Sequence, residues 1–81
     1  MDLHDSLLDE VRAAVAALAP GVRVDDDTPL IGERIIDSLS LLRLVSRLEA
    51  VFPISVRDGD LRPENFESIK AVCAFVEARL P

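Results

Sequence analysis

The stretch Ile36-Asp37-Ser38-Leu39 leads into a periodic segment that ends near Phe52. Apolar residues recur through that segment at the spacing of one helix face, namely Leu41, Leu44, Val45, Leu48 and Phe52. This spacing predicts an amphipathic helix that turns one side toward a hydrophobic core. Asp37 is a favoured N-cap residue for such a helix. The sequence therefore places the hydroxyl group of Ser38 in the first helical turn.

Leu39 has an unusual position on this predicted helix. At about 100° per residue, it falls nearly opposite the apolar stripe of Leu41, Val45 and Leu48. We therefore expect Leu39 to be exposed next to Ser38. An exposed leucine in this place is better explained as a docking contact for another protein than as packing within the chain.

The order Asp37-Ser38-Leu39 at a helix start resembles the phosphopantetheine attachment motif of acyl and peptidyl carrier proteins. A tripeptide alone recurs by chance, and an Asp-Ser pair by itself is usually only a helix cap. The similarity, however, extends from about Thr28 to Leu80. It includes the helix exit Phe52-Pro53-Ile54-Ser55-Val56 and the segment Asp60-Leu61-Arg62-Pro63-Glu64-Asn65-Phe66.

In carrier proteins a phosphopantetheinyl transferase moves 4′-phosphopantetheine from coenzyme A to the serine, and the terminal thiol then holds an acyl group as a thioester. The resemblance therefore implies that Ser38 is the attachment residue, with Asp37 beside it, and that 4′-phosphopantetheine is the covalent cofactor. A phosphodiester on Ser38 would lie at the positive end of the helix dipole, which favours negative charge.

Length and composition limit the other possibilities. The 81 residues predict a single domain over residues 1–81 with little room for an enclosed active site, so we do not expect an enzyme. The net charge of −6 opposes binding to nucleic acid or to an anionic membrane. The longest apolar run, Ala71 to Val76, is far below the ~18 residues of a membrane span, and acids stand where a signal peptide would be basic. We expect a cytoplasmic protein.

The few residues with nucleophilic or metal-binding side chains do not form a reactive cluster in the sequence. Cys73 is the only cysteine and shares an apolar helical stripe with neighbouring residues, so we expect a core residue rather than a nucleophile. His4 is the only histidine and lacks partners for a catalytic dyad or a metal. Asp25, Asp26 and Asp27 could bind a divalent cation weakly, but three consecutive acids do not converge on one ion. We expect a solvated loop and no metal site.

The remaining pattern predicts an all-α fold. We expect a small four-helix bundle of three long helices and one short helix, with a long loop between the first two. The long helices span about Leu3–Ala19, Ser38–Val51 and Ile69–Leu80, the last capped by Ser68. Pro63 would start the short helix, which carries Phe66. The loop 22–36, which has room for a helical turn, is expected to be pinned to the core by Val24, Leu30, Ile35 and Ile36. The segment 54–56 alternates like a strand but lacks a pairing partner, so it is expected to be a linker.

Two features differ from the carriers of fatty acid synthesis, many of which have an acidic second helix. In the segment 37–52, Asp37 and Glu49 are balanced by Arg43 and Arg47, so its net charge is zero. The glycine that commonly precedes the Asp-Ser pair is replaced by an apolar residue, Ile36. The neutral helix disfavours enzymes of fatty acid synthesis as partners. The apolar pair Ile35-Ile36 and the segment Asp60 to Phe66 resemble peptidyl-type and free-standing specialised carriers.

The sequence thus supports two hypotheses. The first is a free-standing, monomeric acyl or aminoacyl carrier of polyketide or nonribosomal peptide-type biosynthesis. Its partners would be a phosphopantetheinyl transferase, a loading enzyme and a downstream synthase or transferase. The alternative is a helical interaction module without a prosthetic group. In both, the expected partner-binding residues are Leu39, Leu42, Arg43 and Arg47. A serine hydrolase is disfavoured because the chain has no Gly-x-Ser-x-Gly elbow. The cargo is left open.

Overall fold

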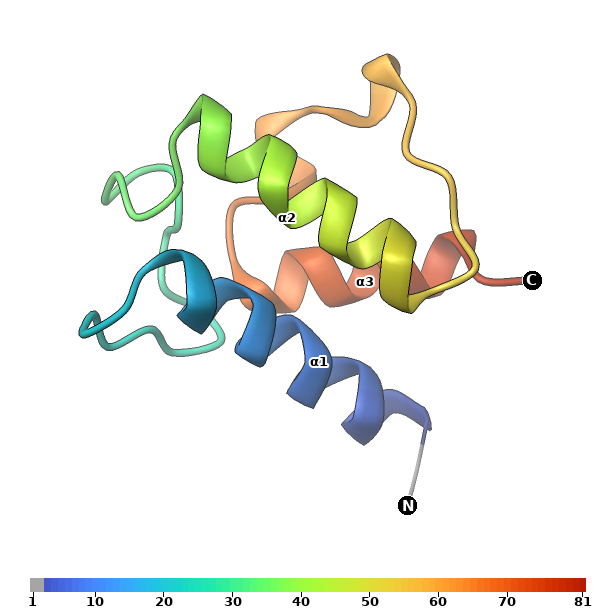
Figure 1. Cartoon of the computed structure of the whole chain (residues 1–81), viewed down its shortest axis with the longest axis horizontal. Helices are drawn as coiled ribbons and strands as arrows, with labels where there is room; N and C mark the ends of the chain where they lie inside the picture. Colours follow the sequence, from blue (N-terminus) through green and yellow to red (C-terminus); the bar gives the residue numbers. More distant parts are fainter. Residues whose placement is uncertain (1–2) are drawn as a thin grey trace.

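The computed structural model describes residues 3–81, which form three α-helices and two short 3₁₀ turns. The α-helices are α1 (Leu3–Leu18), α2 (Ser38–Val51) and α3 (Ile69–Arg79). In Figure 1, α1 runs toward the left of the view, whereas α2 and α3 run toward the right. Helix α1 packs against both of the others. Residues 3–81 contain no strand, which confirms the all-α class and the linker at 54–56.

The helix boundaries follow the predicted caps. The Asp37 carboxylate accepts a hydrogen bond of 2.8 Å from the backbone N–H of Ser40, and α2 ends before Pro53, as predicted. The Ser68 hydroxyl accepts the N–H of Ala71 at 3.0 Å, which confirms it as the cap of α3. Helices α1 and α3 each end one residue earlier than predicted.

The predicted fourth helix is not confirmed. In its place lie two 3₁₀ turns, η1 (Asp58–Asp60) and η2 (Pro63–Asn65). Pro63 does start η2, but Phe66 leaves the helical conformation with a φ of −128°. Its ring is fully buried and lies 5.5 Å from the ring of Phe75, measured between centroids. Insertion of Phe66 into the core therefore ends the turn before an α-helical turn can form.

The core contains the residues that the periodicity placed inside. Buried side chains come from α1 (Leu7, Val11, Ala14, Val15), α2 (Leu44, Val45, Leu48) and α3 (Ile69, Val72, Cys73, Phe75, Val76). Four further apolar residues of the helices and their ends pack against this core and are partly buried, namely Leu8, Leu18, Leu41 and Phe52. The burial of Cys73 confirms its role as a core residue. None of the helices in residues 3–81 combines the length and the apolarity needed to cross a membrane.

The loop between α1 and α2 is pinned to this core as predicted. Leu30 is fully buried and Ile36 nearly so, while Val24 and Ile35 are partly buried. The N–H of Glu33 donates to the carbonyl of Pro29 at 3.0 Å, which gives the loop a single helical turn. This turn brings the chain directly to the start of α2.

We predict that two leucines of α2 differ strongly in their contribution to stability. Leu48 is 1% exposed, so Leu48→Ala should cost ~2–5 kcal/mol of unfolding free energy, the range of buried leucines. Leu39 is 59% exposed, and Leu39→Ala should cost far less. Urea melts followed by circular dichroism measure both variants. Similar losses of stability would show that this account of the orientation of α2 is wrong.

Candidate functional site

Ser38 is the first residue of α2, and its side chain is exposed. The preceding residue, Asp37, is extended (φ −98°, ψ −174°) and caps the helix. Its carboxylate takes the N–H of Ser40, and its carbonyl oxygen accepts the N–H of Leu41 at 2.8 Å. Because Asp37 supplies the cap, the hydroxyl of Ser38 is not needed to hold the helix end. It lies at the positive end of the helix dipole, where an attached anion is favoured.

The electrostatics of Asp37 restrict the chemistry of the site. Hydrogen bonds from the backbone and the hydroxyl of Ser40 hold the pKa of the Asp37 carboxyl below its usual range. A general base works best when its pKa lies near the operating pH. Asp37 is therefore a weak base at neutral pH and a poor acceptor for the proton of Ser38.

A hollow of about 250 Å³ lies beside the serine. It is lined by Ile31, Ile36, Asp37, Ser38 and Leu41. Its walls are mainly apolar, and Ile36 is almost completely buried beneath it. An exposed hydroxyl at a helix start, next to an apolar hollow, fits a phosphodiester that carries a flexible thiol arm. The phosphate would remain at the helix mouth, and the arm would have an apolar surface beside it.

The chain contains a second Asp-Ser-Leu triplet, Asp5-Ser6-Leu7. Ser6 lies within α1 rather than at the first position of a helix that follows a loop. Leu7 is fully buried, whereas Leu39 is exposed. The two triplets therefore differ in the features that matter for an attachment site. The spacing of apolar residues in the sequence distinguishes the two triplets, because Leu7 continues the apolar stripe of its helix and Leu39 does not.

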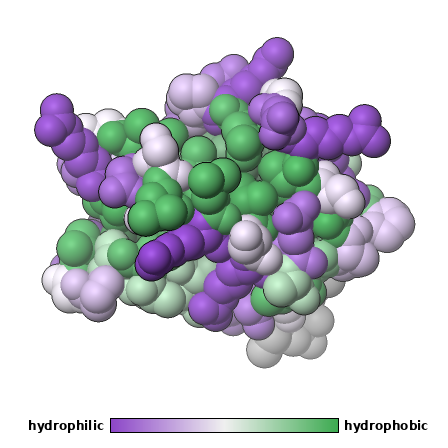
Figure 2. All heavy atoms as spheres, turned by 45° about the horizontal axis from the view of Figure 1, so that its top comes forward, coloured by the Kyte–Doolittle hydropathy of each residue, from purple (hydrophilic) through white to green (hydrophobic). Residues whose placement is uncertain are grey.

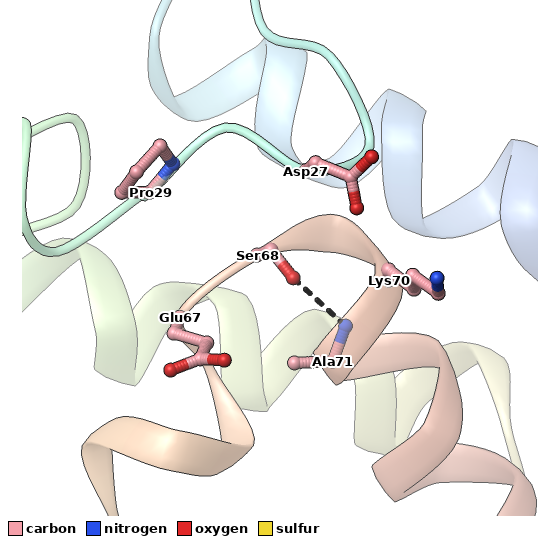
Figure 3. A pocket seen from close by; sticks show the side chains of 6 residues that line it. All are labelled: Asp27, Pro29, Glu67, Ser68, Lys70 and Ala71. Atoms are coloured by element: carbon pink, nitrogen blue, oxygen red, sulfur yellow. Dashed lines mark hydrogen bonds between the residues drawn. The ribbon is translucent and has the colours of Figure 1, made fainter.

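Two larger hollows lie between the loop and α3. Figure 3 shows the first, of about 450 Å³, lined by Asp27, Pro29, Glu67, Ser68, Lys70 and Ala71. Its serine hydroxyl points to the N–H of Ala71 and is used as a helix cap (Figure 3). The second, of about 400 Å³, includes Cys73, and burial raises the pKa of this thiol to about 11. The thiol stays protonated at neutral pH, so neither hollow offers an activated nucleophile.

The acidic run in the loop is divided between different contacts. Asp26 holds the guanidinium of Arg12 through two hydrogen bonds of 2.9 and 2.7 Å, and this contact lowers the pKa of its carboxyl. Asp25 donates its N–H to the hydroxyl of Thr28. Among the side chains described, no three potential metal ligands converge. The side chain of His4 lies outside the described part of the chain.

The expected partner-binding residues form one exposed surface on α2. Leu39 and Leu42 are 59% and 53% exposed, and the predicted exposure of Leu39 is thus confirmed. Arg43 and Arg47 are exposed as well. Figure 2 shows the side of the molecule on which apolar surface spreads over the centre while hydrophilic side chains project around it. Ser38, the first residue of α2, directly precedes Leu39, the first of these four residues along the helix.

Comparison with protein families identifies the class. Residues 5–76 match the family model described as the phosphopantetheine attachment site. The chain belongs to this family of phosphopantetheine-binding carrier proteins, in which 4′-phosphopantetheine is attached covalently to a conserved serine. Carrier domains interact with phosphopantetheinyl transferases and other partner enzymes and are generally non-catalytic themselves. No curated protein gives a sequence match to this chain.

We predict that Asp37 stabilises the folded chain in a pH-dependent manner. A carboxyl whose pKa is lowered by folding adds stability above its unfolded pKa, near ~3.9, and this stability is lost as the pH falls through the folded pKa. Asn is also a good N-cap but does not titrate. Asp37→Asn should therefore be modestly less stable than the wild type at neutral pH, and the difference should vanish in acid.

Urea midpoints measured between neutral pH and about pH 2 at low salt test this expectation. Asp58→Asn is a suitable control, since the Asp58 side chain is exposed and is not the cap of a helix. If the urea midpoints of the wild type and Asp37→Asn differ by the same amount at every pH, the ionised carboxylate of Asp37 is not the cause of the difference in stability.

Proposed function

We propose that Ser38 carries the 4′-phosphopantetheine arm and that the chain holds an acyl or aminoacyl thioester on it for partner enzymes. The observation that carries this proposal is the exposed hydroxyl at the start of α2, freed from capping by Asp37 and set beside an apolar hollow. Of the two Asp-Ser-Leu triplets, only this one combines a helix start with an exposed leucine. The arm, when attached, supplies the thiol that forms the thioester.

In this proposal the chain is the substrate of the attachment reaction and not its catalyst. A new ester bond forms between the Ser38 oxygen and the phosphorus of the pantetheine phosphate, and the diphosphate bond of coenzyme A breaks. The nucleotide portion leaves, and the hydroxyl proton passes to a base of the transferase. The low pKa of Asp37 supports this division of labour, because the carboxylate is a poor base.

The biosynthetic setting is also part of the proposal. Arg43 and Arg47 on α2, and an apolar residue in place of the usual glycine before Asp37, support polyketide or nonribosomal peptide-type biosynthesis over fatty acid synthesis. The partners would be a loading enzyme and a downstream synthase or transferase, which dock on Leu39, Leu42 and the two arginines. The net charge of −6 supports a monomeric carrier without nucleic acid or anionic membrane partners, and we propose a cytoplasmic location for it.

The exposed leucines and arginines of α2 also fit a second candidate, a helical interaction module that carries no prosthetic group. Such a module would bind its partner through the same residues. Attachment of phosphopantetheine therefore separates the two functions, whereas partner binding alone does not.

We predict that Ser38→Ala abolishes attachment and leaves the fold intact. The intact mass, measured after incubation with coenzyme A and a broad-specificity phosphopantetheinyl transferase, should rise by one phosphopantetheine in the wild type only. Ser6→Ala, which alters the second triplet, and Ser55→Ala, which alters an exposed serine outside α2, are matched controls and should be modified normally. A Ser38→Ala variant that folds, by circular dichroism, and still gains the arm would refute the assignment.

We further predict that attachment introduces the only reactive thiol of the native protein. Cys73 is buried and its pKa is raised to about 11, so a thiol reagent at neutral pH should leave the unmodified protein unlabelled. The modified protein should take up one label, and both forms should gain one more after denaturation in urea. Rapid labelling of Cys73 in the native, unmodified chain would contradict the burial described above.

A further inference from the structure

The positive charge on the outer side of α2 is not compensated within the molecule. Arg12 binds Asp26, and Arg79 binds Asp60 while lying 5.1 Å from the ring centre of Phe75. Arg43 and Arg47, by contrast, take part in none of the ion pairs or ring contacts of residues 3–81. Their guanidinium groups are therefore available to a partner.

The acids closest in sequence to these arginines are engaged elsewhere. Glu49, the only acid within α2, accepts the N–H of Val56 at 2.9 Å and is thereby held against the linker that follows the helix. Asp37 is used as the N-cap. Neither carboxylate is paired with Arg43 or Arg47. The exposed side of α2 is thus locally positive in a chain whose net charge is −6.

Leu39, Leu42, Arg43, Ser46 and Arg47 are all exposed and together make up what we call the α2 face. The two leucines provide apolar area of the kind found at the centre of protein interfaces, and the arginines provide a charged rim. Ser46 follows Leu42 by one helical turn and has a short side chain, so it allows a partner backbone to approach between the larger groups.

We infer that the α2 face docks onto an apolar patch that is rimmed by acidic side chains, on the enzymes that load or unload this carrier. The inference rests on the proposed function. The α2 face lies directly after Ser38, so a partner enzyme that reaches an arm on Ser38 has to cover the α2 face. Glutamate or aspartate on the partner would pair with the arginines, and a partner with a basic rim would be repelled.

The size of the molecule explains how a locally positive surface works on an acidic protein. The chain measures 32 × 31 × 19 Å. At about 0.01 M salt the Debye length is about 30 Å, so an acidic partner is repelled by the whole net charge. At physiological salt the Debye length falls to about 8 Å, so the charges at the contact determine the electrostatic part of the affinity. Affinity for an acidic partner should therefore be greatest at intermediate salt.

The test uses the unmodified wild-type chain and two synthetic amphipathic helical peptides. Both peptides have the same leucine face, flanked by glutamate in one and by lysine in the other. Affinities and contact sites are measured from the amide chemical shifts of the ¹⁵N-labelled chain. The acidic peptide should shift the amides of α2 and bind more tightly than the basic one. Arg43→Glu/Arg47→Glu should lower the affinity for the acidic peptide about tenfold or more and raise the affinity for the basic peptide.

Arg23→Glu/Arg62→Glu is the matched control. It changes the net charge by the same amount at two exposed arginines outside α2, with 91% and 68% of their side chains exposed. At physiological salt it should behave as the wild type, and the effect of the α2 variant should fade near 1 M salt. Leu39→Ala/Leu42→Ala should weaken the binding of both peptides.

Three outcomes would overturn the inference: a wild-type preference for the basic peptide, contacts away from α2, or no binding of the acidic peptide. Sedimentation with phosphatidylserine vesicles that depends on Arg43 and Arg47 would instead assign the face to a membrane. These results are independent of the mass measurement on Ser38. If attachment fails but the acidic peptide binds, the carrier function falls and the docking surface stands. If attachment succeeds but the peptide does not bind, only the docking inference falls.

Discussion

The attachment of the long loop to the core through Leu30 is the constraint on which the site depends. The Leu30 side chain is fully buried, and its N–H donates to the carbonyl of Glu67 at 2.8 Å, just before α3. Its own carbonyl accepts the N–H groups of Ile35 and Ile36 at 2.8 and 3.0 Å. One residue thus ties the loop to the entrance of α3 and folds the chain back toward α2. Without this tie, Asp37 and Ser38 would follow a long flexible connection, and the hollow beside the serine would lose its wall at Ile36.

Local signals in the sequence are sufficient to predict the three α-helices. Asp37 and Ser68 are caps whose effect depends on residues three positions away, and the apolar period of α2 fixes which side Leu39 occupies. The contacts that shape the linker between α2 and α3 are of a different kind. Asp60 accepts the N–H of Arg57 at 3.0 Å but also binds the guanidinium of Arg79, which is nineteen residues away. A pairing over that distance leaves no periodic signal in the sequence. The pattern therefore predicts only one short helix that starts at Pro63, where the structure has two 3₁₀ turns, η1 and η2.

The two Asp-Ser-Leu triplets show why the tripeptide alone cannot locate the candidate site. Asp5-Ser6-Leu7 and Asp37-Ser38-Leu39 have the same residues in the same order. What differs is the position of the leucine on its helix. Leu7 is buried and continues the apolar stripe of α1, whereas Leu39 is exposed and lies opposite the apolar stripe of α2. The sequence contained this information, but in the spacing to later apolar residues rather than in the triplet. The ion pair between Asp26 and Arg12, by contrast, joins the loop to α1 and leaves no local signal in the sequence.

The residues that hold the fold and those proposed to face a partner are separate in this chain. Leu30, Leu48 and Phe66 are buried, so changes there act on stability, whereas Leu39, Leu42 and Arg43 are exposed and contribute little to the core. The thiol of Cys73 has a raised pKa and the carboxyl of Asp37 a lowered one, so neither is an effective nucleophile or base at neutral pH. A carrier benefits from both properties. Its scaffold does not compete chemically with the thioester on its arm, and its docking residues can vary with the partner while the buried residues continue to hold Ser38 at the start of α2.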